Sequence, residues 1–151
     1  MKTESYICCR IDDIRLGIPL HYIDRVIRAV AVKPIPNSPQ IIHGLIDFYG
    51  TVIPVLNLRN RFAIRELAIS PDQIFVLITT KIRKLALVAD LAEGIITMED
   101  GDIIPASRLD ARIEATGIYR TKDGVVIIYD PEQFLSGDDA IELDECIQNL
   151  G

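Results

Sequence analysis

Two apolar runs near the middle of the chain, separated by a glycine turn, give the clearest structural signal in the sequence. Residues 44–49 and 52–58 flank Gly50 and Thr51, and strand, glycine turn, strand is the pattern of a β-hairpin. The second run is apolar without alternation, which is typical of a strand buried on both faces. Pro54 lies inside this run and cannot donate a ladder hydrogen bond, so it predicts a bulge or a sheet edge.

Shorter apolar segments before the hairpin predict further strands. They cover residues 6–11, 16–20 and 22–32. The longest of them mixes apolar and charged residues on both faces, which is unusual for a strand that only covers a core. After the hairpin, Asn57 can cap a short helical turn over residues 58–62.

The second half of the sequence repeats the first with a period of about seventy residues. Three residue pairs keep this spacing: Pro36 and Pro105, 69 apart; Gly50 and Gly124, 74 apart; Phe62 and Phe134, 72 apart. Duplication of one β unit explains such a period, and many short strands at this spacing predict barrels or sandwiches. We therefore expect an all-β fold with similar halves over residues 12–70 and 71–136, with the N-terminal strand as a candidate for exchange into the second half.

A final helix is predicted over residues 138–150. Asp138 or Asp139 can cap it, and acidic residues in its first turn favour the helix dipole. Its apolar side chains recur at i, i+3, i+4 and i+7: Leu143, Cys146, Ile147 and Leu150. This stripe can pack on the protein's own barrel or bind a partner, and packing on the barrel is the commoner arrangement.

Charge is distributed unevenly along the 151 residues, whose net charge is −6. Residues 1–65 carry nine Lys/Arg and five Asp/Glu, a balance of +4, whereas residues 66–151 carry seven and seventeen, a balance of −10. The net negative charge argues against nucleic acid as the main partner, because phosphate binding requires a basic face. The asymmetry reflects either locally paired charges or complementary ends that favour head-to-tail self-association.

The sequence contains no arrangement of residues that predicts catalysis, a cofactor or a metal site. His21 and His43 are the only histidines and lack metal-ligand spacing, and no glycine-rich phosphate loop occurs. Asp47, Asp90 and Asp130 follow predicted strands, where carboxylates commonly accept turn amides. A protein without such groups is best interpreted as an interaction module.

Cysteine usage and hydropathy indicate a cytoplasmic protein that does not insert into a membrane. Cys8, Cys9 and Cys146 show no CxxC spacing and are expected to be reduced thiols. No uninterrupted apolar run approaches the length that spans a bilayer.

The hairpin region resembles the signature of the CheW family, the adaptor domains of bacterial chemosensory arrays. Residues 44–62, GLIDFYGTVIPVLNLRNRF, follow roughly the family pattern G-hydrophobic-x-N-L-R-G, two residues, I-P-V-x-D-L-R. The resemblance continues in LGIPLHYIDRVIRAVAVKPIPNSP, LALVADLAEGI, IIPASR and GVVIIYDPEQFL. It covers nearly all of residues 1–151 as one domain. It implies two five-stranded, SH3-like β-barrels packed together, with short helical turns and a C-terminal helix.

The resemblance also implies a function. Family members are non-enzymatic adaptors without cofactors that couple the tip of a methyl-accepting chemoreceptor to the regulatory domain of a CheA-type histidine kinase. Matching positions on the receptor-facing surface are Ile23, Arg25, Ile27, Tyr49 and Arg59. The corresponding kinase-facing candidates in the second barrel are Leu91, Ile95 and Ile96. The structural turn and close-approach positions are Gly44, Gly50 and Pro54.

The chain departs from the usual family pattern in three places. Asp47-Phe48-Tyr49-Gly50 stands in place of N-L-R-G, so that Tyr49 replaces the arginine; Arg25 stands where the family usually carries Glu; and Asn57 replaces the aspartate of D-L-R. We predict that the ion pair that these two positions form in the family is replaced here by a cation–π contact between Arg25 and Tyr49, worth about 0.5–2 kcal/mol. The alternative is that residues 25 and 49 changed independently of each other on a solvent-exposed surface. A divergent module that self-associates, or that serves another pathway such as pilus-based motility, is the second interpretation.

Overall fold

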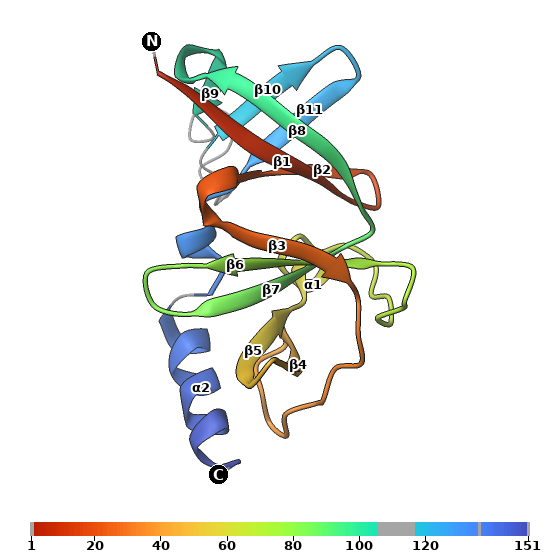
Figure 1. Ribbon diagram of the computed structural model, residues 1–151, viewed down its shortest axis with the longest axis vertical. Coiled ribbons are helices and arrows are strands. Elements are labelled where there is room, and N and C mark those ends of the chain that lie inside the picture. The colour runs from red at the N-terminus through yellow and green to blue at the C-terminus, as the bar shows by residue number, and fades with distance from the viewer. Residues whose placement is uncertain (1, 106–116, 136, 151) are drawn as a thin grey trace.

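The strands form two curled sheets, which lie one above the other in Figure 1. The computed structural model describes residues 2–105, 117–135 and 137–150. The strands are β1 (Thr3–Ile11), β2 (Ile14–Pro19), β3 (Ile23–Arg28), β4 (Ile42–Phe48), β5 (Thr51–Leu56), β6 (Ile74–Thr79), β7 (Lys84–Ala89), β8 (Leu91–Glu99), β9 (Ile103–Pro105), β10 (Gly117–Thr121) and β11 (Gly124–Ile128). The helices are α1 (Leu58–Arg61) and α2 (Gly137–Gln148), with short 3-10 turns at Leu20–Tyr22, Asp100–Asp102 and Pro131–Gln133. The predicted all-β fold of two small SH3-like barrels is confirmed, although the short β9 gives one sheet six strands instead of five.

Each barrel contains strands from both halves of the sequence. Barrel 1 has the strand order β3-β6-β7-β5-β4 and spans residues 23–89. Barrel 2 has the order β8-β1-β2-β11-β10-β9, so the first hairpin joins the strands at the end of the chain. The boundary predicted near residue 70 therefore does not separate the barrels, because β6 and β7 complete barrel 1 and β2 completes barrel 2. Residues 106–116 and 136 of the predicted second half lie outside the described residues.

The two barrels repeat the same strand pairing. In barrel 1, β5 runs parallel to β7 and pairs Val55 with Ala86. In barrel 2, β11 runs parallel to β2 and pairs Ile127 with Leu16. The sequence period of about seventy residues relates β5 to β11 and β2 to β7, so the same kind of parallel pair closes each barrel. The two repeats have thus exchanged their first hairpins while keeping the same strand pairing.

The hairpin of β4 and β5 turns one residue earlier than the sequence predicts. Tyr49 and Gly50 occupy the turn, with φ angles of 51° and 88°, and Phe48 pairs with Thr51. The Gly50 amide donates a 2.9 Å hydrogen bond to the Asp47 carboxylate. Two-residue turns with positive φ suit the twist of a hairpin, but they favour Asn-Gly. Tyr49 is therefore held in a left-handed conformation that costs roughly 1–2 kcal/mol.

Pro54 lies at the limit of the pairing between β5 and β7. β5 is an interior strand, yet it pairs with β7 only at Val55 and Leu56, directly after the proline. The bulge of this hairpin lies in β4, next to Gly44, and not at Pro54. A Cβ atom at Gly44 would overlap the carbonyl oxygen of Lys33, so only glycine allows the connector to approach this closely.

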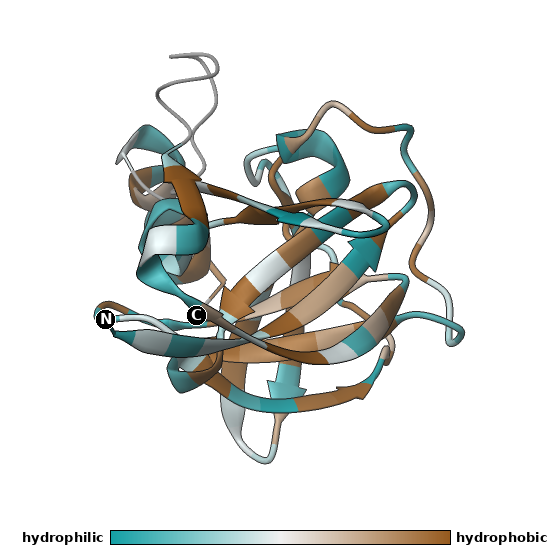
Figure 2. Cartoon of the chain, turned by 90° about the horizontal axis from the view of Figure 1, so that it is seen from above, coloured by the Kyte–Doolittle hydropathy of each residue, from teal (hydrophilic) through white to brown (hydrophobic). Residues whose placement is uncertain are grey.

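Among the described residues, the buried hydrophobic side chains form three clusters. The largest includes Ile18 of barrel 2, Ile78 of barrel 1 and Leu143 of α2, and therefore joins both barrels to the helix. A second cluster surrounds Phe75 in barrel 1, and a third surrounds Tyr6 in barrel 2. Figure 2 shows the corresponding hydrophobic segments running through strands in the middle of the molecule.

Helix α2 packs three of the four predicted stripe residues on the protein's own core, which is the commoner arrangement, whereas Leu150 lies beyond the end of the helix and is 49% exposed. Leu143 is fully buried, and Cys146 and Ile147 pack against the largest cluster. The helix begins at Gly137, so Asp138 and Asp139 lie in its first turn instead of capping it. There they still favour the helix dipole.

Candidate functional site

One candidate docking surface lies where β3 meets the β4–β5 hairpin. The guanidinium carbon of Arg25 lies 5.3 Å from the centroid of the Phe48 ring, so the predicted cation–π contact is made with Phe48 and not with Tyr49. The Tyr49 ring meets Phe48 edge-on, with centroids 4.7 Å apart. Tyr49 is 92% exposed and neighbouring Val52 is 55% exposed. We call Arg25, Phe48, Tyr49 and Val52 the Arg25–Tyr49 patch.

A bulge in β3 decides which of its side chains reach this surface. The register with β6 shifts between Ile23 and Arg25, leaving Asp24 as the extra residue. Ile23 packs against the largest core cluster and Ile27 against the cluster of barrel 1, so both are half-buried. Arg25 and Val26 are exposed. Of the three predicted residues of this strand, only Arg25 lies mainly at the surface.

The edge strand of barrel 2, β8, offers a second candidate surface. Leu91 is 44% exposed and Ile95 is 64% exposed. Ile96 packs against the cluster around Tyr6. The three predicted kinase-facing residues thus lie on one edge strand, with two side chains open to solvent and one that also contacts the core.

The two edge strands are built alike around an acidic bulge residue. The sequence repeat relates Asp24 in β3 to Glu93 in β8, and each lies where the register of its strand shifts. Lys84 lies 3.6 Å from Asp24, and Arg15, which the repeat relates to Lys84, lies 3.0 Å from Glu93. The next residue is Arg25 in β3 but a glycine in β8. Arg25 is therefore a feature that distinguishes the two surfaces.

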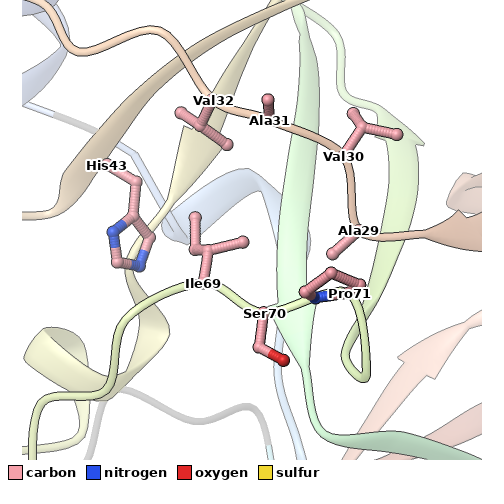
Figure 3. A pocket seen from close by; sticks show the side chains of 8 residues that line it. All are labelled: Ala29, Val30, Ala31, Val32, His43, Ile69, Ser70 and Pro71. Carbon is pink, nitrogen blue, oxygen red and sulfur yellow. The ribbon is translucent and has the colours of Figure 1, made fainter.

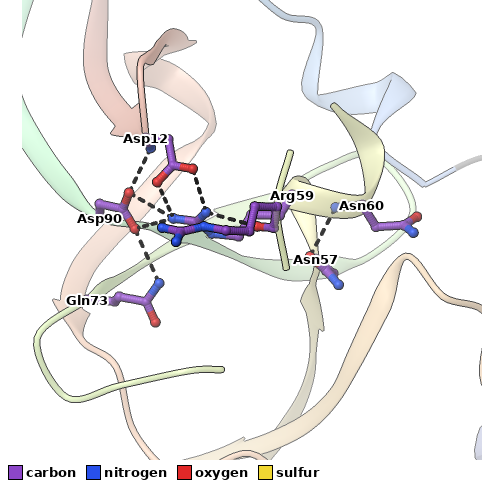
Figure 4. A network of polar contacts seen from close by, with 7 residues as sticks. Asp12, Asn57, Arg59, Asn60, Gln73 and Asp90 are labelled. Carbon is purple, nitrogen blue, oxygen red and sulfur yellow. Dashed lines mark hydrogen bonds and ion pairs between the residues drawn. The ribbon is translucent and has the colours of Figure 1, made fainter. Parts of the chain in front are cut away.

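Arg59 is buried and does not belong to the exposed receptor-facing surface to which the family pattern assigns it. It lies in α1, which begins as predicted after the cap Asn57, whose side chain accepts a hydrogen bond from the Asn60 amide. The guanidinium donates to the Asp12 carboxylate at 3.0 and 3.1 Å and to the Asp90 carboxylate at 2.9 Å (Figure 4). Arg59 is only 5% exposed because these two carboxylates and the surrounding core enclose it.

This Arg59 network connects the two barrels. Asp12 lies in the β1–β2 turn of barrel 2, and Asp90 lies where the chain leaves barrel 1 for barrel 2. The Asp12 amide and the Gln73 side-chain amide also donate to Asp90, at 2.7 and 3.3 Å. Burial raises the pKa of Asp90, but the Asp12 amide, the Arg59 guanidinium and the Gln73 amide outweigh burial and hold that pKa below its usual value. Charged, hydrogen-bonded side chains therefore connect the two barrels at their junction.

The residues of this network are not apparent from the sequence pattern. Asp12 falls between the strands predicted over residues 6–11 and 16–20, and nothing in the local pattern singles out Gln73. The predicted roles of Asp47, Asp90 and Asp130 as acceptors of turn amides are confirmed, by the amides of Gly50, Asp12 and Glu132 respectively.

A cavity of about 410 Å³ lies beside barrel 1, between residues 29–32 and 69–71 (Figure 3). Its lining is mostly apolar, with His43 and Ser70 as the polar members. Burial lowers the pKa of His43, and the nearby Glu66 charge opposes this only in part. Among the described residues, no group of three or more His, Cys, Asp or Glu could hold a metal ion. Within the same part of the chain, no helix has the length and hydropathy needed to cross a membrane.

Comparison with known proteins agrees with this architecture. A family model described as a CheW-like domain matches residues 5–139. FrzA of Myxococcus xanthus is 33% identical over 103 residues, which cover 68% of this chain and 64% of FrzA, slightly less than two thirds of that relative. Chemotaxis protein CheW of Treponema pallidum is 25% identical over 127 residues, covering 80% of this chain and 75% of that protein.

A solved structure extends the likeness to three dimensions. The crystal structure of the scaffolding protein TtCheW from Thermoanaerobacter tengcongensis matches with a TM-score of 0.81 at 22% identity. The match covers 91% of this chain and 96% of that one, and it shows a shared fold. The chain therefore belongs to the CheW-like domain family and, like that family, is non-catalytic.

Proposed function

We propose that this protein is a cytoplasmic adaptor that couples the tip of a methyl-accepting chemoreceptor to the regulatory domain of a CheA-type histidine kinase. The observation that carries the proposal is the pair of equivalent edge strands, β3 and β8, one on each barrel, both with exposed apolar side chains. Family membership supports it, since curated relatives are named chemotaxis proteins. A body with two such surfaces can hold two partners at once.

The receptor contacts the β3 side of barrel 1 in this proposal. Arg25 and Tyr49 are exposed and supply the direct contacts, whereas Ile23 and Ile27 support the strand from the core side. Exposed aromatic and arginine side chains are the residue types enriched at the centre of protein interfaces.

The kinase regulatory domain contacts the β8 side of barrel 2. Leu91 and Ile95 are exposed, and Ile96 contacts the core. The charge of Glu93 on this strand is neutralised within the protein, because Glu93 pairs with Arg15. The contact is therefore expected to depend more on apolar burial than on charge.

The turn residues and the Arg59 network shape these surfaces without touching a partner. Gly44 allows close approach of the connector, Gly50 completes the hairpin turn, and Pro54 ends the ladder with β7. Arg59 holds the barrels in one body. Two modest interfaces on such a body keep receptor and kinase together at a high effective concentration, which raises the lifetime of the assembly.

Binary binding assays with the two fragments test the assignment. A receptor-tip fragment and a kinase regulatory domain from the same organism are each immobilised and titrated with the wild type, Tyr49→Ala and Ile95→Ala. We expect Tyr49→Ala to weaken receptor binding and Ile95→Ala to weaken kinase binding, each by about tenfold and without affecting the other partner. Val125→Ala, at another exposed position of barrel 2, is the control. The reverse pattern would contradict the assignment of the faces, and no binding to either fragment would contradict the function.

A second candidate function is self-association of a divergent module, in this or another pathway such as pilus-based motility. Its support is the difference in charge between barrel 1 and the rest of the sequence. Residues 23–89, which form barrel 1, carry nine Lys/Arg and four Asp/Glu, a balance of +5, and the remaining residues carry seven and eighteen, a balance of −11. Association between unlike ends should weaken as salt rises, which sedimentation velocity at about 0.05 M and 0.5 M salt would measure. A monomer at both salt concentrations would contradict this alternative.

A further inference from the structure

We infer that the Arg25–Tyr49 patch selects a partner segment that carries a carboxylate close to an apolar side chain, and that these two contacts set partner specificity. The inference rests on the proposed adaptor function and adds the chemistry of the partner. The patch combines an exposed cation, held by Phe48, with an exposed ring at the tip of a hairpin.

Arg25 is available to pair with a carboxylate. It makes no ion pair with any described residue, because its neighbour Asp24 is engaged by Thr79 at 2.6 Å and by Lys84 at 3.6 Å. The Phe48 ring orients the guanidinium without neutralising it. Barrel 1 as a whole carries a balance of +5, so the field around the patch also favours an acidic partner.

Tyr49 occupies its position at a cost to the fold. It has a φ of 51° in a turn that favours asparagine, and 92% of its surface is exposed, so stability does not explain the aromatic residue. A large exposed ring gains free energy only when a partner covers it. Tyr49 is therefore best explained as a contact residue that needs an apolar site on the partner.

The spacing of the patch limits the partner segment. The guanidinium lies 5.3 Å and the Tyr49 ring 4.7 Å from the centroid of the Phe48 ring, so the two groups are close neighbours on the surface. Residues three or four positions apart on a helix are also close neighbours, because one turn brings them to the same face. For a helical partner segment, we expect a Glu or Asp three or four positions from a Leu, Met or similar residue on its exposed face. A basic residue in place of that Glu or Asp would be repelled.

Charge reversal and a turn-compatible substitution test the inference with the receptor-tip fragment from the same organism. Arg25→Glu and Tyr49→Asn should each weaken binding by about tenfold or more. Two control variants match these changes: Arg28→Glu is an equal charge reversal on the same strand, and Ile82→Ser removes another exposed apolar residue from a hairpin tip. The controls should change binding by less than about threefold. Because asparagine suits the turn, Tyr49→Asn should unfold at the same urea concentration as the wild type or a higher one.

A compensating change makes the test specific to the carboxylate. Each exposed Glu and Asp of the tip is replaced in turn by Lys, and one of these replacements should weaken binding to the wild type and restore binding to Arg25→Glu. The inference is overturned if no replacement does so, or if the controls lose as much binding as the test variants. It is also overturned if the wild type sediments as a dimer and Arg25→Glu sediments as a monomer, because a second copy then occupies the patch. If the wild type binds the receptor tip and neither Arg25→Glu nor Tyr49→Asn weakens this binding, only this inference is overturned. Absence of wild-type binding to both receptor and kinase fragments overturns the proposed function.

Discussion

Removal of the Arg59 side chain tests whether the buried network holds the two barrels together. Arg59→Ala eliminates the hydrogen bonds to Asp12 and Asp90 and leaves two carboxylates facing each other without a cation. Breaking a buried ion pair by removing one partner costs about 3–5 kcal/mol. The side chains of Asp12 and Asp90 are 33% and 27% exposed, so water relieves part of this cost. We expect the free energy of unfolding to fall by about 2–4 kcal/mol.

Urea unfolding followed by circular dichroism measures this loss. Arg65→Ala is the matched control, because Arg65 is exposed and its backbone carbonyl, which the substitution keeps, accepts the hydrogen bond from Arg59. Arg59→Lys should fall between the two, since lysine keeps the charge but cannot make the paired contacts of a guanidinium. A loss below about 1 kcal/mol in Arg59→Ala, or an equal loss in the control, would refute the structural role assigned to the network.

Three further predictions concern the neighbouring structure. Burial depresses the pKa of His43, so stability should decline as pH falls from about 6.5 through the lower folded-state value, and His43→Gln should flatten this decline in urea midpoints measured between pH 7.5 and 5. A similar decline in the variant would contradict it. Gly44→Ala should lower the free energy of unfolding by at least about 2 kcal/mol, because the added Cβ overlaps the Lys33 carbonyl; an unchanged urea midpoint would exclude this close approach. Leu143→Ala should cost about 2–5 kcal/mol and detach α2 from the core. The exposed Ile141→Ala should change stability by less than about 0.5 kcal/mol in the same thermal or urea assay, and equal effects of the two would argue against the packing of α2.

Local features of the fold were predictable because each depends on residues close together in the sequence. The β4–β5 hairpin, the Asn57 cap of α1 and the apolar stripe of α2 all follow from spacing within a few residues. The division into barrels was not predictable in this way. It depends on the parallel pairing of β5 with β7 and of β11 with β2, and such long-range pairing leaves no local pattern.

The candidate site also depends on contacts between residues far apart in the sequence, which leave no local pattern. Arg59 matches a family position, but its burial depends on Asp12 and Asp90, which are 47 and 31 residues away. The cation–π partner of Arg25 is displaced by one residue because the turn falls at Tyr49 and Gly50, which leaves the preceding Phe48 beside the guanidinium. The bulge at Asp24 likewise changes which β3 side chains are exposed, and alternation alone does not reveal it.

A bridging assay tests whether one molecule of this protein binds receptor and kinase at the same time. The kinase regulatory domain is immobilised, and retention of the receptor-tip fragment is measured with and without this protein. We predict that the fragment is retained only when the wild-type protein is present, and that Tyr49→Ala or Ile95→Ala each reduces this retention. Retention that is equal with and without the protein, or absent in both cases, would contradict the proposed coupling.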